Sequence, residues 1–283
     1  MLFPRVFTSA LAARKRGEPF ILLVPPRGSV AAGTILDENW QPPETQTGTS
    51  EVPVVMLHGT IANGGCWEHL AERLMAEGRQ VAVPTFGARG TSGISQSYGE
   101  VTDVVHEVLR KTGAKRVDLV GHSQGGMLIG WMVAAMYGNG PDSMVEALPR
   151  GSIRTAIAIS GTHRGVPRPR KALRGFFSQA IIGESLGEIM LMGDNTMWDS
   201  PETWQYAIDV DADSSFPHWY DIVSYEDGIV PATSALRAHS PIEMPGATTL
   251  VLEKELGHGV RHPLQPSHPE IIDLVARILH SDD

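Results

Sequence analysis

The chain has 283 residues, of which 42% are hydrophobic and 19% charged, a composition ordinary for a globular protein. With 23 basic and 32 acidic residues, its formal net charge is −9, which argues against broad nucleic-acid binding. The single cysteine, Cys66, excludes an internal disulfide framework. An α/β fold of this length can form one unit with a single large core.

No apolar stretch approaches the roughly 18 to 20 residues that a membrane-spanning helix needs, so no transmembrane segment is expected. Basic residues flank residues 3–13, but no uninterrupted apolar segment follows them before Gly17, so no export signal is predicted. We therefore expect a cytoplasmic protein. Secretion is the alternative if this chain is the processed product of a longer precursor.

The chain divides into an irregular lead-in over residues 1–52 and a single domain over residues 53–283. Residues 25–53 are rich in Pro, Gly, Thr and Ser, which favours irregular structure. Beyond them, apolar patterns predict in chain order a strand at 52–57, a helix at 67–77, a strand at 80–86, a helix around 101–109, a strand at 117–120, a helix at 127–137, strands at 155–160, 221–225 and 249–253, and a helix at 269–280. This alternation predicts an α/β fold whose mostly parallel sheet carries helices on both faces.

Residues 161–219 interrupt the alternation. They contain a basic run over residues 164–174 and then the apolar side chains of Phe176, Phe177, Ile181 and Ile182. Because the segment falls between two strands on the expected catalytic side, we interpret it as a cap or lid that shapes an acyl pocket. An ordinary surface excursion is the alternative.

Ser123 lies in the pattern that is most informative about function. A short apolar run, residues 117–120, leads into Gly121-His-Ser-Gln-Gly125, and a helix is predicted directly afterwards. A G-x-S-x-G pattern between strand and helix indicates a nucleophile elbow, a strained turn that holds the serine hydroxyl outward. Gly121 and Gly125 supply the lack of bulk that so sharp a turn needs, and Gly126 lets the helix approach the strand. The sequence therefore predicts Ser123 as a catalytic nucleophile.

A serine nucleophile needs a base, usually an imidazole that a carboxylate orients. Asp227 is the predicted carboxylate, because it follows the strand 221–225 in an Asp-Gly turn at the carboxyl edge of the sheet. Asp221 and Glu226 are its competitors. For the base, both His258 and His262 follow the last strand, and spacing alone does not separate them. His268 begins the final helix and is interpreted as a cap or surface residue.

An oxyanion hole requires two N–H donors near the nucleophile. The backbone N–H of Gln124 follows Ser123 directly, and the N–H of Thr60 follows the strand 52–57, so these two are the predicted donors. His58 precedes Ser123 in the chain, and we expect it to form hydrogen bonds within its own loop rather than to act as the base.

We expect no metal site and no cofactor. Asp209, Asp211 and Asp213 alternate as calcium-loop ligands do, but Ser214 and Tyr220 stand where Gly and Glu would be required. No histidine cluster has zinc-ligand spacing, and no glycine-rich motif has nucleotide-binding spacing. Cys66, near the predicted oxyanion loop, is interpreted as a buried small residue.

Four segments together resemble the lipases and esterases of the α/β-hydrolase superfamily. They are Val54-Val-Met-Leu-His-Gly-Thr60, Gly121-His-Ser-Gln-Gly-Gly126, Gly161-Thr-His-Arg-Gly165 and Asp227-Gly-Ile-Val-Pro231. The chain is most like the actinobacterial-type triacylglycerol lipases, from about residue 50 onward. In that group a short loop, an Asp-Pro and a Val/Ile-rich helix follow the catalytic histidine. Residues 262–275 match that layout, with His268 in the acidic position, so the resemblance favours His262 as the base.

These lines converge on a serine carboxylic-ester hydrolase that acts through an acyl-enzyme on a small-molecule or lipid ester. A thioesterase, amidase or acyltransferase with the same triad is the alternative within enzymes. A catalytically silent α/β-hydrolase fold that binds a ligand is the alternative outside them. Such lipases often carry an export signal and paired cysteines, and this sequence shows neither. The oligomeric state is not predicted.

Overall fold

The computed structural model describes residues 33–38, 40–41, 52–138, 145–166, 183–192, 214–235 and 247–281. Within them, six strands form one parallel sheet in the order β2-β1-β3-β4-β5-β6. The strands are β1 (Val54–Leu57), β2 (Val81–Ala82), β3 (Val117–His122), β4 (Ile153–Ile159), β5 (His218–Val223) and β6 (Thr248–Val251).

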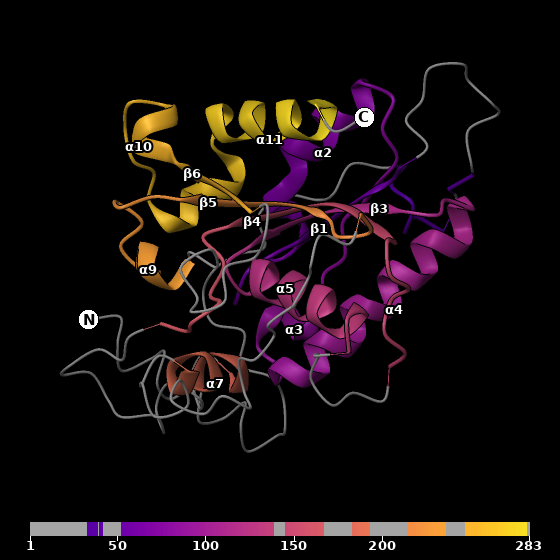
Figure 1. Ribbon diagram of the computed structural model, residues 1–283, viewed down its shortest axis with the longest axis horizontal. Coiled ribbons are helices and arrows are strands. Elements are labelled where there is room, and N and C mark those ends of the chain that lie inside the picture. The colour runs from indigo at the N-terminus through magenta and orange to yellow at the C-terminus, as the bar shows by residue number, and fades with distance from the viewer. Residues whose placement is uncertain are drawn as a thin grey trace, which may run out of the picture.

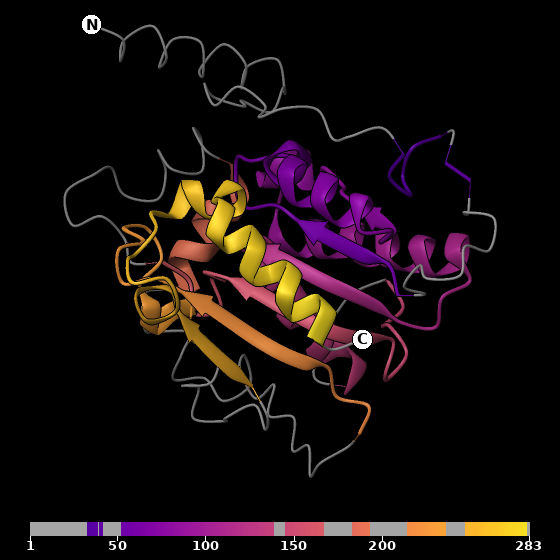
Figure 2. The same cartoon turned by 90° about the horizontal axis from the view of Figure 1, so that it is seen from above.

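Helices cover both faces of this sheet (Figure 1). One face carries α3 (Gly87–Gly90), α4 (Ile94–Thr112), α5 (Gln124–Met136), α7 (Glu184–Met192) and α9 (Ala232–Ala235). The other carries α2 (Glu68–Ala76), α10 (Leu252–Glu255) and α11 (Pro269–Ser281), and α11 lies over the sheet when the molecule is seen from above (Figure 2). Two 3-10 helices, η1 (Gly64–Trp67) and η2 (His262–Ser267), complete the described elements. The predicted fold class is thereby confirmed.

The sheet separates two apolar clusters, because successive side chains of a strand point to opposite faces. Val55 and Leu57 of β1 pack in the cluster that contains the apolar residues of α4 and α5. Val54 and Met56 pack in the cluster that contains those of α2 and α11. All four side chains are fully buried, as expected for a parallel strand with helices on both faces.

Two predicted strands are shorter than expected. The strand predicted at 80–86 is wrong beyond Ala82, where β2 ends. The strand β2 lies at the edge of the sheet, and Pro84 has no N–H to donate to a neighbouring strand. The chain then leaves the extended conformation at Gly87. The strand predicted at 249–253 ends at Val251, where α10 begins. The helix predicted around 101–109 is longer than expected, because α4 runs from Ile94 to Thr112. The other predicted strands and helices agree with the structure to within about three residues.

Parts of the predicted lead-in and insertion fall among the described residues. Within residues 1–52, Ile35 is fully buried, and its N–H donates to the carbonyl of Val81 at 2.8 Å. Within residues 161–219, the structure describes 161–166, 183–192 and 214–219, which include α7. Asp209, Asp211 and Asp213 and the apolar residues 176–182 lie outside the described residues.

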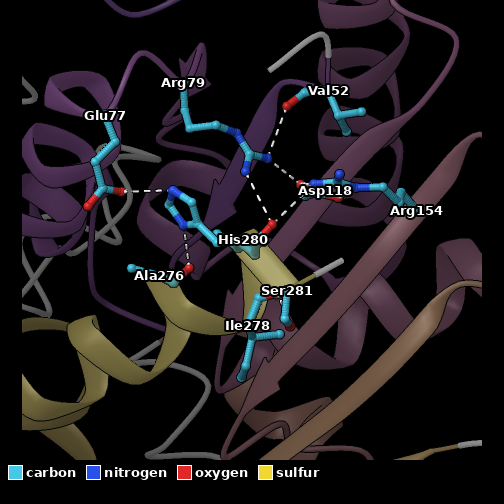
Figure 3. Close-up of polar contacts among 10 residues, drawn as sticks. Val52, Glu77, Arg79, Asp118, Arg154, Ala276, Ile278, His280 and Ser281 are labelled. Carbon is cyan, nitrogen blue, oxygen red and sulfur yellow. Dashed lines mark hydrogen bonds and ion pairs between the residues drawn. The ribbon is translucent and has the colours of Figure 1, made fainter. Parts of the chain in front are cut away.

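A polar network ties the sheet to the end of α11 (Figure 3). Arg79 and Arg154 each donate to Asp118 Oδ2 of β3 at 2.5 Å, and all three side chains are buried or nearly so. Both guanidinium groups also donate to the carbonyl of Leu279, at 3.3 and 3.4 Å. The network therefore joins α11 to two parallel strands at the edge where those strands begin.

Candidate active site

Ser123 occupies a strained turn between β3 and α5. Its φ of 56° and ψ of −119° lie outside the regions that most L-residues adopt. A Cβ at Gly121 would come within 2.5 Å of the Gly125 carbonyl carbon, and one at Gly125 within 2.3 Å of the Leu57 oxygen. A Cβ at Gly126 would lie 3.0 Å from the Gly161 Cα. The glycine pattern thus has the steric reason that the sequence suggested.

Asp227 and His262 lie side by side at the carboxyl edge of the sheet, after β5 and at the start of η2. His262 Nδ1 is 2.7 Å from Asp227 Oδ2, and both side chains are buried. Asp227 Oδ1 accepts hydrogen bonds from the N–H groups of Ile229 at 2.9 Å and Val230 at 2.6 Å. The Gln265 amide donates to Asp227 Oδ2 at 2.9 Å. The turn after β5 and the helix η2 therefore surround one carboxylate with hydrogen-bond donors.

These contacts keep the Asp227 carboxylate ionised. Burial by itself would raise its pKa, but the hydrogen bond and charge of His262 and the two backbone N–H donors outweigh burial, so the pKa lies below its usual value. An ionised carboxylate only accepts hydrogen bonds, so His262 carries a proton on Nδ1. In the neutral ring, Nε2 is then the atom available to accept a proton.

A cavity of about 220 Å³ brings the predicted nucleophile and base together. Its lining residues are Gly59, Thr60, Ile61, Ala62, Asn63, Cys66, Arg89, His122, Ser123, Ile229, His262, Pro263 and Pro266. The rings of His122 and His262 are in contact, with centroids 4.3 Å apart, which places His262 beside the Ser123 turn. Most of the other lining side chains are apolar, as is usual for a small-molecule pocket.

The loop that follows β1, residues 59–63, forms one wall of this cavity, and we call it the oxyanion loop. A Cβ at Gly59 would come within 2.9 Å of the Ser123 Cβ, so the loop packs closely against the elbow. Thr60 Oγ1 donates to Gln124 Oε1 at 3.2 Å. The two residues predicted to supply oxyanion donors are therefore joined by a hydrogen bond between their own side chains.

His58 lies outside the cavity lining and is fully buried. Its Nδ1 is 2.8 Å from the Gly59 carbonyl, its Nε2 accepts the Phe86 N–H at 3.2 Å, and its ring stacks on Phe86 at 4.2 Å. Burial above all, with the charge of Arg89, lowers the pKa of His58 to about 4. His58 thus forms one hydrogen bond within its own loop, as expected, and a second with the segment that follows β2.

His258 and His268 lie away from the cavity lining. His258 is exposed, and its Nε2 is 2.7 Å from Glu270 Oε2. A hydrogen bond with the Gly259 carbonyl and the Glu270 carboxylate raise its pKa. His268 directly precedes α11, and its carbonyl accepts the Ile272 N–H at 3.0 Å, as a capping residue's does.

The two competing carboxylates, Asp221 and Glu226, lie in other surroundings. Asp221 is fully buried in β5, where its Oδ1 accepts the Trp219 indole N–H at 2.9 Å and lies 3.5 Å from His163 Nε2. The side chain of Glu226 is exposed. Of the three candidates, Asp227 is the one in contact with His262.

Two residues at this site were not anticipated. Gln265 contacts Asp227, and Arg89 lines the cavity. Gln265 follows His262 by one turn of η2, but a lone glutamine in a Pro-containing segment carries no recognisable sequence signal.

Within the described residues, no group of three or more histidine, cysteine or acidic side chains could hold a metal ion. No helix in that part of the chain is long and apolar enough to span a bilayer.

Comparisons with known proteins give one family match and one named relative. The model of the Alpha/beta hydrolase family matches residues 54–272. A triacylglycerol lipase of Vibrio cholerae is 31% identical over 144 residues, which are 49% of this chain and 43% of that protein, so the match spans less than half of the relative.

Solved structures share the fold. A monoacylglycerol lipase of Paleococcus ferrophilus is 18% identical, with a TM-score of 0.53 over 82% of this chain and 96% of that chain. A gene product of Listeria innocua is 15% identical, with a TM-score of 0.54 over 81% of this chain and 94% of that chain. At these identities the likeness concerns the fold alone.

Proposed function

The chain belongs to the alpha/beta hydrolase family, and we propose that it is a serine carboxylic-ester hydrolase of lipase or esterase type. The observation that carries the proposal is the constellation around one cavity. Ser123 on a strained elbow and His262 line the cavity together, and His262 is hydrogen-bonded to the buried, ionised Asp227. This is the combination of nucleophile, base and orienting carboxylate that acyl transfer requires.

In the first half of the proposed reaction, Ser123 Oγ attacks the ester carbonyl carbon while its proton passes to His262 Nε2. Asp227 holds the imidazole by Nδ1 and stabilises the imidazolium that forms. The carbonyl oxygen becomes an oxyanion, which the backbone N–H groups of Thr60 and Gln124 stabilise. His262 then gives the proton to the leaving alkoxide oxygen, and an acyl ester of Ser123 remains.

The second half repeats these steps with water. His262 Nε2 takes a proton from a water molecule whose oxygen attacks the acyl carbon, and the same two N–H groups stabilise the second oxyanion. The tetrahedral intermediate collapses, the proton returns to Ser123 Oγ, and the carboxylic acid is released. The apolar side chains of Ile61, Ile229 and Pro266 along the cavity suit the hydrocarbon part of an ester.

The name of the Vibrio cholerae relative favours esters over the other acyl compounds that the same triad could cleave. His262 is favoured over His258 as the base, because His258 is exposed, pairs with Glu270 and does not line the cavity. Chain-length preference distinguishes a lipid ester from a small soluble ester as the substrate.

The test is hydrolysis of p-nitrophenyl esters from acetate to palmitate. We expect Ser123→Ala and His262→Ala each to lose about 10⁴-fold or more in kcat, because triad members act as a unit. His258→Ala is the matched control, a histidine in contact with a carboxylate outside the cavity, and should keep wild-type turnover.

Retention of turnover by Ser123→Ala would refute the mechanism. Loss of activity in His258→Ala but not in His262→Ala would overturn the choice of base. A wild-type protein that cleaves thioesters or amides but no ester of the series would overturn the substrate class.

A further inference from the structure

Residues Gly87–Gly90 form a left-handed turn beside the active site. Their φ values are 56°, 47°, 65° and 70°, so four successive residues adopt the left-handed conformation. The Gly90 N–H donates to the Phe86 carbonyl and the Thr91 N–H to the Gly87 carbonyl, both at 2.8 Å. Ala88 and Arg89 are not glycines, so this backbone costs free energy at both positions. Strain of this kind persists only where surrounding contacts enforce it.

The inner side of the left-handed turn contacts the oxyanion loop. Arg89 Nη2 donates to the Ile61 carbonyl at 2.7 Å, and Arg89 Nε donates to the Ala62 carbonyl at 3.2 Å. Ile61 is itself left-handed, with φ 59°. Thus one planar guanidinium joins two strained segments, and it binds successive carbonyls that a lysine ammonium could not hold in the same geometry.

Gly90 completes the inner contact. A Cβ at this position would come within 3.0 Å of the Gly59 oxygen, 3.1 Å of the Thr60 Cα and 2.6 Å of Gln124 Oε1. The backbone of the left-handed turn therefore packs directly against both residues that would supply the oxyanion donors.

The left-handed turn is the element labelled α3 in Figure 1. Its outer side contacts α7, which lies on the same face of the sheet (Figure 1). Ser185, fully buried, donates its hydroxyl to the Gly90 carbonyl at 2.6 Å, and its N–H donates to the Thr91 carbonyl at 3.4 Å. Glu188 Oε2 accepts the N–H of Ile94, the first residue of α4, at 2.6 Å. Helix α7 thus holds the turn through residues that do not line the cavity.

We propose that the left-handed turn is a clamp that positions the oxyanion loop, with Arg89 as its inner contact, Ser185 as its outer contact, and both as positioning residues for catalysis. The proposal rests on the proposed function, because the placement of the Thr60 N–H matters for rate only if an oxyanion forms beside Ser123. Donors must lie about 2.7–3.1 Å from that oxygen, and a misplacement of about 1 Å can lower the rate about 10²-fold.

Arg89→Lys tests the inner contact, since it keeps the charge and removes the fork. With p-nitrophenyl butyrate we expect kcat to fall about 10- to 100-fold and KM to change less than about threefold, because the oxyanion exists only in the transition state. Affinity for butaneboronic acid, which becomes tetrahedral on Ser123, should fall by a factor similar to that in kcat/KM. Arg150→Lys, which alters an arginine that donates to the Met136 carbonyl far from the cavity, is the matched control.

Ser185→Ala tests the outer contact and removes a single hydroxyl, so it keeps the proposal testable if Arg89→Lys folds poorly. Loss of one hydrogen bond predicts a fall in kcat of about three- to fivefold. Its matched control is Ser281→Ala, which removes a hydroxyl that donates to the Ile278 carbonyl on α11 (Figure 3). In the double variant, the combined loss should be smaller than the product of the single losses, because both contacts act through the same turn.

Amide hydrogen exchange in a peptide covering residues 57–66 tests the clamp independently of ester hydrolysis. Faster exchange there in Arg89→Lys and Ser185→Ala, with unchanged exchange in α11, is expected whether or not esters are hydrolysed. Unchanged exchange in that peptide would overturn the clamp, and so would a kcat within threefold of wild type in both variants. A wild-type protein inactive on esters would instead defeat the proposed function and leave the exchange result to decide the clamp.

Discussion

The buried His58 should make this protein less stable in mild acid, by an amount that the structure allows to be worked out. Burial above all, with the charge of Arg89, lowers the pKa of His58 from 6.5 to about 4 and keeps the ring neutral in the folded state, where Nε2 accepts the Phe86 N–H. The unfolded chain takes up a proton below about pH 6.5 and the folded chain does so only near pH 4. The contribution of His58 to the free energy of unfolding is therefore fully present above pH 6.5 and declines as the pH falls toward 4.

The size of the effect follows from the two pKa values. The pKa of His58 is 6.5 in the unfolded chain and about 4 in the folded protein. Lowering the pH from 7 to 4.5 should therefore lower the free energy of unfolding by about 2 kcal/mol through this residue. Carboxylates with lowered pKa values, such as Asp227, add their own losses in acid. A variant without an imidazole at position 58 is needed to isolate the histidine.

Urea unfolding of the wild type and of His58→Gln at pH 7 and pH 4.5 provides the assay. The variant will be less stable at pH 7, because it loses the stack on Phe86, so the readout is the change with pH and not the absolute stability. The wild type should lose about 2 kcal/mol more than the variant. Equal losses, or an NMR titration of His58 near pH 6.5 in the folded protein, would refute the argument.

Three further outcomes follow from named contacts. Asp118→Ala should lower the free energy of unfolding by about 3–5 kcal/mol in urea titration, because it leaves two buried arginines without their shared carboxylate (Figure 3); a loss below about 1 kcal/mol would contradict this. Gln265→Leu removes a donor to Asp227 and should lower kcat about tenfold on p-nitrophenyl butyrate, while an unchanged kcat would show that the amide does not help to place the carboxylate. Gly125→Ala would bring a Cβ within 2.3 Å of the Leu57 oxygen, so loss of both thermal stability and ester hydrolysis is expected, and an active, stable variant would disprove the steric argument.

Much of the fold and the elbow could be predicted from the sequence, because those features depend on neighbours in the chain. Apolar strands that alternate with amphipathic helices indicate a parallel sheet with two covered faces. The glycines around Ser123 indicate a sharp turn, since their spacing meets steric demands within five residues. The turn position of Asp227 after its strand follows from the same local logic. The strand β2 was predicted too long, because its length depends on its position at the edge of the sheet.

Only the tertiary structure decided which side chains meet across long distances in the chain. His258 and His262 follow the same strand, and spacing alone left them equivalent, but the fold turns one toward Asp227 and pairs the other with Glu270. The contact of Arg89 with the oxyanion loop depends on a left-handed backbone at a residue other than glycine. Such a conformation is unfavourable locally and forms because distant segments, among them Ser185, hold it in place.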